Sequence, residues 1–155
     1  MTQHFRIAAA DPEDAAAVAC LSAYYALLID RCADITPADF PYPDPEAALY
    51  RPPQGTFLLA WSEGRPVACA ALKSVDLHTG EVKRLWVDPI ARGQGVAKQM
   101  MAAIEQAARA RGITRLRLDT NSALIEAVAL YRATGWSDVA AFTNYPATHW
   151  FGKSL

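Results

Sequence analysis

Hydrophobic and polar residues alternate along residues 81–87 (EVKRLWV), which is the pattern of a half-buried β-strand. Strict alternation divides the side chains between two faces, with Val82, Arg84 and Trp86 on one and Lys83, Leu85 and Val87 on the other. Asp88-Pro89 ends the strand, because proline has no N–H for the ladder and restricts the residue before it.

Apolar residues recur at helical spacing in three segments, which predicts helices over 12–33, 94–111 and 122–134. Asp11 is the expected N-cap of the first helix, with Pro12 at its first position. Further strands are expected over 4–8, 56–61, 67–75, 113–118, 136–141 and 148–153. Six prolines between residues 37 and 53 predict a loop, with one helical turn over 46–50. The order β-α-loop-β-β-β-α-β-α-β-β indicates an α/β fold in one domain, 1–155.

The composition is that of a globular protein, with 52% hydrophobic and 20% charged residues among 155. A formal net charge of −1 and a pI near 6.3 argue against a nucleic-acid partner, which a basic face would attract. No apolar run approaches the roughly 20 residues that span a bilayer, and the N-terminus does not resemble a signal peptide, so no membrane partner is expected. Three widely spaced cysteines suggest reduced thiols in a cytoplasmic protein. The three histidines have no ligand spacing, so no metal is expected.

Residues 92–97 (RGQGVA) join the central strand to the next helix and form a candidate anion site. A helix start has unpaired N–H groups and a positive dipole end, which suit a phosphate. Gly93 and Gly95 let the backbone approach that anion without a Cβ in the way. A Rossmann fingerprint fails at Lys98, and the chain has no P-loop sequence. Taken alone, the stretch is equally well read as a tight turn with a helix cap.

Two motifs together resemble the GNAT superfamily of acyl-CoA-dependent N-acyltransferases. Residues 92–97 fit Q/R-x-x-G-x-G/A after the fourth strand, and residues 130–136 (LYRATGW) fit L-Y-x-x-x-G-F/W on the last helix. The resemblance is strongest over 56–136, extends to the C-terminal HWFGKSL and fades over 1–55. It implies a single-domain GNAT-like fold, in which helices flank a mixed, mostly antiparallel central sheet.

The resemblance implies acetyl-CoA as cosubstrate and no metal. Backbone N–H groups of the glycine turn would hold the pyrophosphate, and Arg92 could add a charge-assisted contact. The strand end would expose a backbone N–H near Trp86–Val87–Asp88 to the thioester carbonyl. Lys98 has a second interpretation, as a solvated lysine on the helix face. The implied cofactor-binding residues are Trp86, Val87, Arg92, Gly93, Gln94, Gly95, Val96, Ala97, Lys98 and Asn121.

Tyr131 and Glu81 are the predicted catalytic residues. Tyr131 occupies the motif position of a tyrosine near the thioester sulfur, and a phenol with a pKa of about 10 can protonate the leaving thiolate. Glu81, at the start of the central strand, is the candidate base for the amine, acting through water. The structural alternatives are a tyrosine that packs the helix on the sheet and an exposed strand-start glutamate.

One position departs from the family pattern. Many GNAT sequences have an asparagine where this chain has Leu124. Asn121 could replace that contact to the pantetheine, or N-cap the helix together with Ser122.

The acceptor is predicted to be a primary amine of a small molecule or a protein. Five carboxylates against Arg31 alone between residues 30 and 46, together with nearby aromatic residues, would suit a cationic amine between this loop and the segment after Trp136. Arg31 or Arg51 could instead hold a carboxylate, which would favour an amino-acid substrate. The function predicted is N-acetyltransfer by direct attack. The alternative is a non-catalytic acyl-CoA-binding module, and a homodimer is left open.

Overall fold

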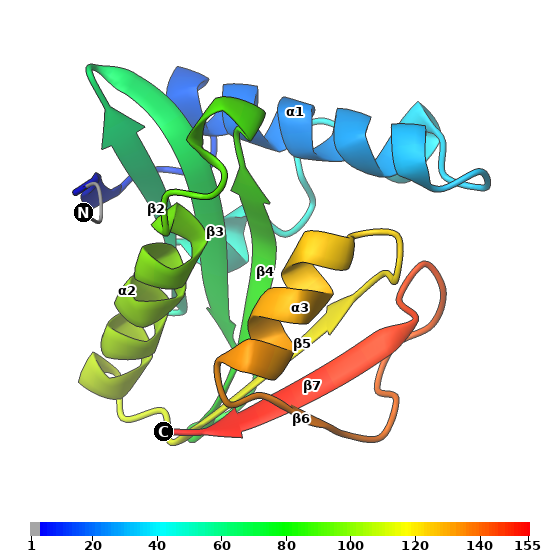
Figure 1. The fold of residues 1–155 in the computed structure, drawn as a ribbon. Helices are drawn as coiled ribbons and strands as arrows, with labels where there is room; N and C mark the ends of the chain where they lie inside the picture. The colour runs from blue at the N-terminus through cyan, green and yellow to red at the C-terminus, as the bar shows by residue number, and fades with distance from the viewer. Residues whose placement is uncertain (1–3) are drawn as a thin grey trace.

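The fold of residues 4–155 is centred on one open seven-stranded sheet in the order β1-β2-β3-β4-β5-β7-β6 (Figure 1). The structure is a computed structural model, which describes these residues. All neighbouring strands are antiparallel except β4 and β5, which confirms the mixed, mostly antiparallel sheet. The strands are β1 (Arg6–Ala9), β2 (Gly55–Ser62), β3 (Arg65–Ser74), β4 (Thr79–Val87), β5 (Arg115–Thr120), β6 (Ser137–Asp138) and β7 (His149–Ser154).

Helices cover both faces of the sheet. Helix α1 (Ala15–Arg31) lies on one face, and α2 (Val96–Ala110) and α3 (Ile125–Ala133) lie on the other (Figure 1). The α1 face buries Leu59, Cys69 and Trp86 against the helix, whereas the opposite face buries Leu58, Leu72 and other aliphatic residues under α2. Burying apolar surface on both faces is what allows an α/β sheet to form the centre of a domain. The three cysteines are free and buried.

The proline-rich segment is an ordered loop that contains two short 3₁₀ helices, η1 (Pro37–Asp39) and η2 (Ala47–Tyr50). A third, η3 (Pro89–Ala91), follows β4. The η2 turn confirms the single helical turn expected over 46–50. Tyr50 on this turn is buried against β2 and β3, so the loop is packed along the sheet.

Strands β4 and β5 pair over only three residues and then separate. Thr79–Glu81 of β4 pairs with Arg115–Arg117 of β5, but β4 continues to Val87 and β5 to Thr120 without further pairing between them. Figure 1 shows the two strands diverging beyond this point. The separation leaves one backbone edge of each strand without a ladder partner, at the centre of the sheet.

A β-bulge in β4 lies where the separation begins. Arg84 and Leu85 together face only Ala70, because Cys69 pairs with Trp86 and Ala71 with Lys83. Arg84 has φ 62°, a left-handed conformation that a non-glycine residue seldom adopts. The extra residue reverses which face the following side chains occupy.

Several predictions from the sequence are wrong in detail. The strand expected over 136–141 is reduced to the two residues of β6, Ser137–Asp138. Val82 and Trp86 lie on opposite faces, because the bulge between them breaks the strict alternation. Asp11 is not the N-cap of α1, which begins at Ala15 after Asp14. The Asp11 carboxylate instead accepts hydrogen bonds from the Glu13 N–H and the Arg51 guanidinium, which hold residues 11–14 in a turn before the helix. The predicted domain begins at residue 1, and its first three residues lie outside the described part.

Candidate active site

A cavity of about 290 Å³ lies between the glycine turn, the end of β4 and helix α3; we call it the turn cavity. Its lining is largely aliphatic and backbone, and includes Leu27, Val87, Gly93, Gly95, Ala127 and Leu130. An elongated ligand with an apolar middle and an anionic end would match such a lining, since the anionic end would lie at the start of α2.

Two left-handed glycines shape the turn before α2. Gly93 has φ 77° and Gly95, the N-cap of α2, has φ 82°. In the part of the chain that the structure describes, no side-chain hydrogen bond caps the start of α2, so its first N–H groups are not used by a capping group. A Cβ built on Gly93 would meet no atom within 4 Å, so the space above the turn is open. Open space above free N–H groups is the arrangement that an anion requires.

The side chains predicted to bind the cofactor fall into two groups: most line the turn cavity, and one stabilises the turn. Trp86, Val87, Arg92, Val96, Ala97 and Lys98 all line the turn cavity with the two glycines. Arg92 lies 3.9 Å from the Glu126 carboxylate on α3, a loose ion pair that leaves its guanidinium partly exposed. Gln94 is not part of the lining; its side-chain amide donates to the Ile90 carbonyl and braces the turn. The residues around the turn thus fit a phosphate group.

The edge of β4 presents backbone donors to the separation. The Asp88 N–H donates to the Val67 carbonyl on β3, so it is not free for a ligand. Successive N–H groups of a strand point to opposite sides, so the Val87 N–H points away from β3 toward the gap. Of the three residues predicted to supply a donor, Val87 has the appropriate direction.

A second cavity of about 440 Å³ lies between the proline-rich loop, β4, β5 and residues 143–147; we call it the loop cavity. Its charged lining residues are Asp34, Asp39, Lys83, Arg84 and Asp119. Tyr24 and Leu124 line both cavities, and a hollow of about 20 Å³ at their junction also touches Tyr131 and Asp119. The loop cavity has the location predicted for the acceptor, between the loop and the segment after Trp136.

Two tyrosines meet at the junction of the cavities. Tyr131 on α3 is buried, and its ring contacts Trp136 and Phe151 with centroid distances of 5.8 Å. Burial raises the pKa of Tyr131 well above its ordinary value, and nearby Tyr24 and Asp119 add to the effect. Burial likewise raises the pKa of Tyr24 to about 12. Both hydroxyls therefore keep their protons at neutral pH.

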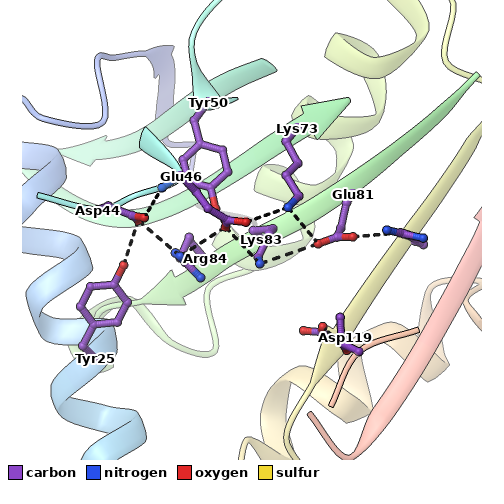
Figure 2. Close-up of polar contacts among 11 residues, drawn as sticks. Tyr25, Asp44, Glu46, Tyr50, Lys73, Glu81, Lys83, Arg84 and Asp119 are labelled. Carbon is purple, nitrogen blue, oxygen red and sulfur yellow. Dashed lines mark hydrogen bonds and ion pairs between the residues drawn. The ribbon is translucent and has the colours of Figure 1, made fainter. Parts of the chain in front are cut away.

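Glu81 lies in an ion network on the α1 face, not in a cavity lining. Its carboxylate is 2.8 Å from Arg117 Nε, 3.8 Å from Lys73 Nζ and 3.7 Å from Lys83 Nζ, and its side chain is only 4% exposed (Figure 2). The network continues through Glu46, which contacts Lys73, Lys83 and Arg84. Although burial opposes ionisation, hydrogen bonds from Lys73 and Tyr50 lower the pKa of Glu46 to about 2. The Glu46 carboxylate is therefore an ionised partner of these cations.

Other predicted ligand groups are occupied by protein partners. The Asn121 side chain accepts a hydrogen bond from the Ala123 N–H and donates to the Pro146 carbonyl, and it lines the loop cavity. Arg31 forms a bidentate ion pair with Glu126, and Arg51 binds Asp11 and Glu13. Neither arginine lines either cavity.

Sequence reasoning missed Tyr24 and Asp119. Both are half-buried, and both line the loop cavity and the junction. The adjacent pair Tyr24-Tyr25 could have indicated Tyr24. Neighbouring side chains on a helix point about 100° apart, so the two rings cannot lie on the same line along the helix. A carboxylate in the otherwise regular strand LRLDT could have signalled Asp119.

The glycine turn, the separated strands and the paired cavities define an acyltransferase-like site. The profile of the Acetyltransferase (GNAT) family matches residues 21–136, and the chain belongs to this family. The Escherichia coli protein named uncharacterized N-acetyltransferase YjgM is 30% identical over 132 residues, which cover 83% of this chain and 77% of that protein.

Other similarities agree with this assignment. The IAA acetyltransferase of Azospirillum brasilense is 38% identical over 95 residues, which cover 60% of this chain and 61% of that protein, less than two thirds of its length. A candidate acyl-CoA N-acyltransferase from Klebsiella pneumoniae superposes with a TM-score of 0.77 at 29% identity and 97% coverage of both chains. The PaiA N-acetyltransferase of Thermoplasma acidophilum, solved with coenzyme A, shares the fold with a TM-score of 0.77 at 15% identity, over 99% of this chain and 100% of that one.

Within residues 4–155, no helix combines the length and apolarity needed to cross a bilayer. In the same part of the chain, no three His, Cys, Asp or Glu side chains are grouped as metal ligands.

Proposed function

We propose that this protein is an N-acetyltransferase that moves the acetyl group of acetyl-CoA to a primary amine by direct attack. The observation that carries the proposal is the meeting of two cavities at the gap between β4 and β5, with Tyr24 and Leu124 as shared walls. One cavity suits a ligand with an anionic end, and the other suits a polar acceptor. Transfer between two ligands requires them to meet at one point, and these cavities do so.

Acetyl-CoA would supply an activated thioester when bound. The backbone N–H groups of residues 93–98 bind its pyrophosphate, with Arg92 and Lys98 as charged contacts around the turn. The Val87 N–H polarises the thioester carbonyl at the open edge of β4. Tyr131 at the junction donates its hydroxyl proton to the departing sulfur. Asn121 is assigned to the loop cavity instead of the cofactor contacts.

The acceptor amine needs to lose a proton before or during attack. An alkyl ammonium with a pKa of about 10.4 has only a small neutral fraction at pH 7, so a nearby carboxylate helps. Asp119 lies at the junction, whereas the Glu81 carboxylate is engaged by three cations outside it. We therefore assign proton acceptance to Asp119 and the positioning of Lys83 to Glu81.

A thiol-release assay with acetyl-CoA and a panel of primary amines tests this function. We expect release that depends on both protein and amine, together with mass-spectrometric detection of the N-acetyl product. Calorimetry measures acetyl-CoA binding in the same preparation. Binding without turnover on any amine would support the alternative, an acyl-CoA-binding module, for which the loop cavity has no evident use.

A further inference from the structure

The two edges of the β4–β5 gap have opposite charges. Lys83 and Asp119 each lie two residues beyond the last paired positions, Glu81 and Arg117, and both line the loop cavity. Had the ladder continued, they would be cross-strand neighbours on the α1 face. No ion pair joins Lys83 to Asp119 in residues 4–155, because the strands have separated between them. The gap therefore holds a positive group and a negative group apart, across the cavity.

The ion network around β4 contains one more cation than carboxylates, and of its cations Lys83 and Arg84 lie on β4, Lys73 on β3 and Arg117 on β5. Four cations, Lys73, Lys83, Arg84 and Arg117, contact three carboxylates, Asp44, Glu46 and Glu81 (Figure 2).

Arg84 concentrates part of this excess beside the cavity. The bulge directs it into the cluster, and its Nε is buried without a hydrogen-bond partner in the described chain. Its terminal nitrogen lies 3.3 Å from Asp44 and 3.5 Å from Glu46, whereas its Nε donor is used by neither carboxylate. A largely buried cation with an unused donor on a cavity wall favours an anionic ligand group.

Beyond its last paired residue, Arg117, strand β5 presents the Asp119 carboxylate to the gap. Asp119 accepts one hydrogen bond, from the Thr143 hydroxyl at 2.6 Å, and no described cation forms an ion pair with it. Figure 2 shows this side chain outside the network of dashed contacts. Asp119 also touches the junction with Tyr24 and Tyr131, where an attacking amine would have to lie. An ammonium group placed at Asp119 is thus adjacent to the point of transfer.

We propose that the acceptor is an amine that also carries a carboxylate, with the charge pattern of a free amino acid. This inference rests on the proposed function and specifies its substrate class. The ammonium group binds Asp119, and the carboxylate binds Lys83 in the field of Arg84. The remaining substituent faces Ile35, Phe40 and Tyr145 on the far wall of the loop cavity.

A simple cationic amine fits the same cavity less well. Two of the loop carboxylates that suggested such a substrate, Asp44 and Glu46, are already bound by Arg84, Lys73 and Lys83. A cation without a carboxylate would bring no negative group to Lys83 and Arg84 on the cavity wall, and both would repel it. A carboxylate on the ligand replaces that repulsion with an ion pair.

The first test compares matched acceptors with the unaltered protein. Free amino acids with a primary amine are assayed against their methyl esters and the corresponding decarboxylated amines, by thiol release with acetyl-CoA at a fixed pH. We expect kcat/KM for the best amino acid to exceed that for its ester and its amine at least tenfold. Equal or faster turnover of the esters, the amines or a peptide N-terminus overturns the inference but leaves the proposed function intact. Turnover of none of them would count against both, and binding of acetyl-CoA would then indicate the module.

The second test uses two lysines that share their partners. Lys73 and Lys83 both contact Glu46 and Glu81 and are equally exposed, but only Lys83 lines the loop cavity. We expect Lys83→Gln to raise KM for the amino acid at least tenfold and to leave KM for its ester unchanged, whereas Lys73→Gln preserves the preference for the acid. The same loss in both variants would mean that Lys83 acts only through the network, and would overturn its role. Lys83→Arg keeps the charge and should retain the preference for the acid. It replaces Lys83→Gln in this test if that variant does not fold.

Discussion

The turn cavity and the loop cavity share two wall residues but differ in the chemical groups that line them. The turn cavity is lined by aliphatic side chains and by backbone at the start of α2, from the end of β4, the turn and α3. The loop cavity is lined by charged, hydroxyl and amide side chains from the loop, β4, β5 and residues 143–147. Recognition in the first depends on backbone geometry, and recognition in the second depends on individual side chains. Side-chain substitutions should therefore act differently on the two ligands.

Removing the hydroxyl at the junction should give the largest effect, because the step between the two ligands depends on it. We expect Tyr131→Phe to lower kcat about 100-fold while acetyl-CoA affinity changes little. Steady-state kinetics and calorimetry measure the two quantities. Tyr24→Phe is the matched control, since it removes the other phenol at the junction. If the rate loss followed Tyr24 instead, the acid would be reassigned to α1.

The pH dependence sharpens the same assignment. Burial raises the pKa of Tyr131, so the phenol keeps its proton to higher pH than an ordinary tyrosine, whose pKa is about 10. Consequently kcat should not decline between about pH 8 and 9.5 through loss of this proton. A decline in that range that disappears in Tyr131→Phe would contradict the raised pKa.

The turn cavity should be sensitive at its glycines. Gly95→Asp places a Cβ and a negative charge beside the expected pyrophosphate, so acetyl-CoA affinity should fall well over tenfold, which corresponds to about 1.4 kcal/mol or more. Gly64→Asp is the control, because Gly64 has a similar φ of 75° in a turn that lines neither cavity. Calorimetry on both folded variants separates backbone strain from ligand contact. Unchanged affinity in Gly95→Asp would remove the phosphate site from the turn.

The acidic rim of the loop cavity should give the smallest effect. Asp34→Asn removes one rim charge, and an exposed charge contributes about 0.2–1 kcal/mol, so KM for the amine should rise about 1.4- to 5-fold. KM for acetyl-CoA should not change. Asp30→Asn is the control, because Asp30, near the end of α1, is also exposed but lines neither cavity. A lower KM for the amine in Asp34→Asn would indicate that the rim repels the acceptor.

The difference between the cavities also explains what the sequence could reveal. The glycine turn is contiguous in the sequence. Its proposed role as a phosphate site depends on left-handed backbone conformations, which its two glycines indicate. The motif around Tyr131 likewise fits within one helix, and the structure brings that residue to the junction with the turn cavity. The order of strands and helices followed from local periodicity, and the helices were placed within a few residues of their observed bounds.

The loop cavity could not be inferred in the same way, because its residues come from segments far apart in the chain. The excess of carboxylates in residues 30–46 looked like free charge, but Asp44 and Glu46 are paired with cations of β3 and β4. Glu81 was recognised as important, yet its neighbours Lys73 and Arg117 come from adjacent strands whose register is not visible in the sequence. The bulge at Arg84 could not be predicted either, because nothing in the sequence of the strand indicates that an arginine adopts a left-handed backbone conformation.

The bulge makes the number of residues in β4 as important as their identity. Because Arg84 is the extra residue, the side chains after it alternate between the faces of the sheet in the opposite sense to those before it. Lys83 and Trp86 therefore occupy the same face although they are three residues apart. Lys83 belongs to the loop cavity, and Trp86 and Val87 belong to the turn cavity. Deleting one residue here would restore a regular ladder and exchange the faces of the strand on one side of the deletion. A chain without this bulge would therefore have lost the alignment of its two cavities.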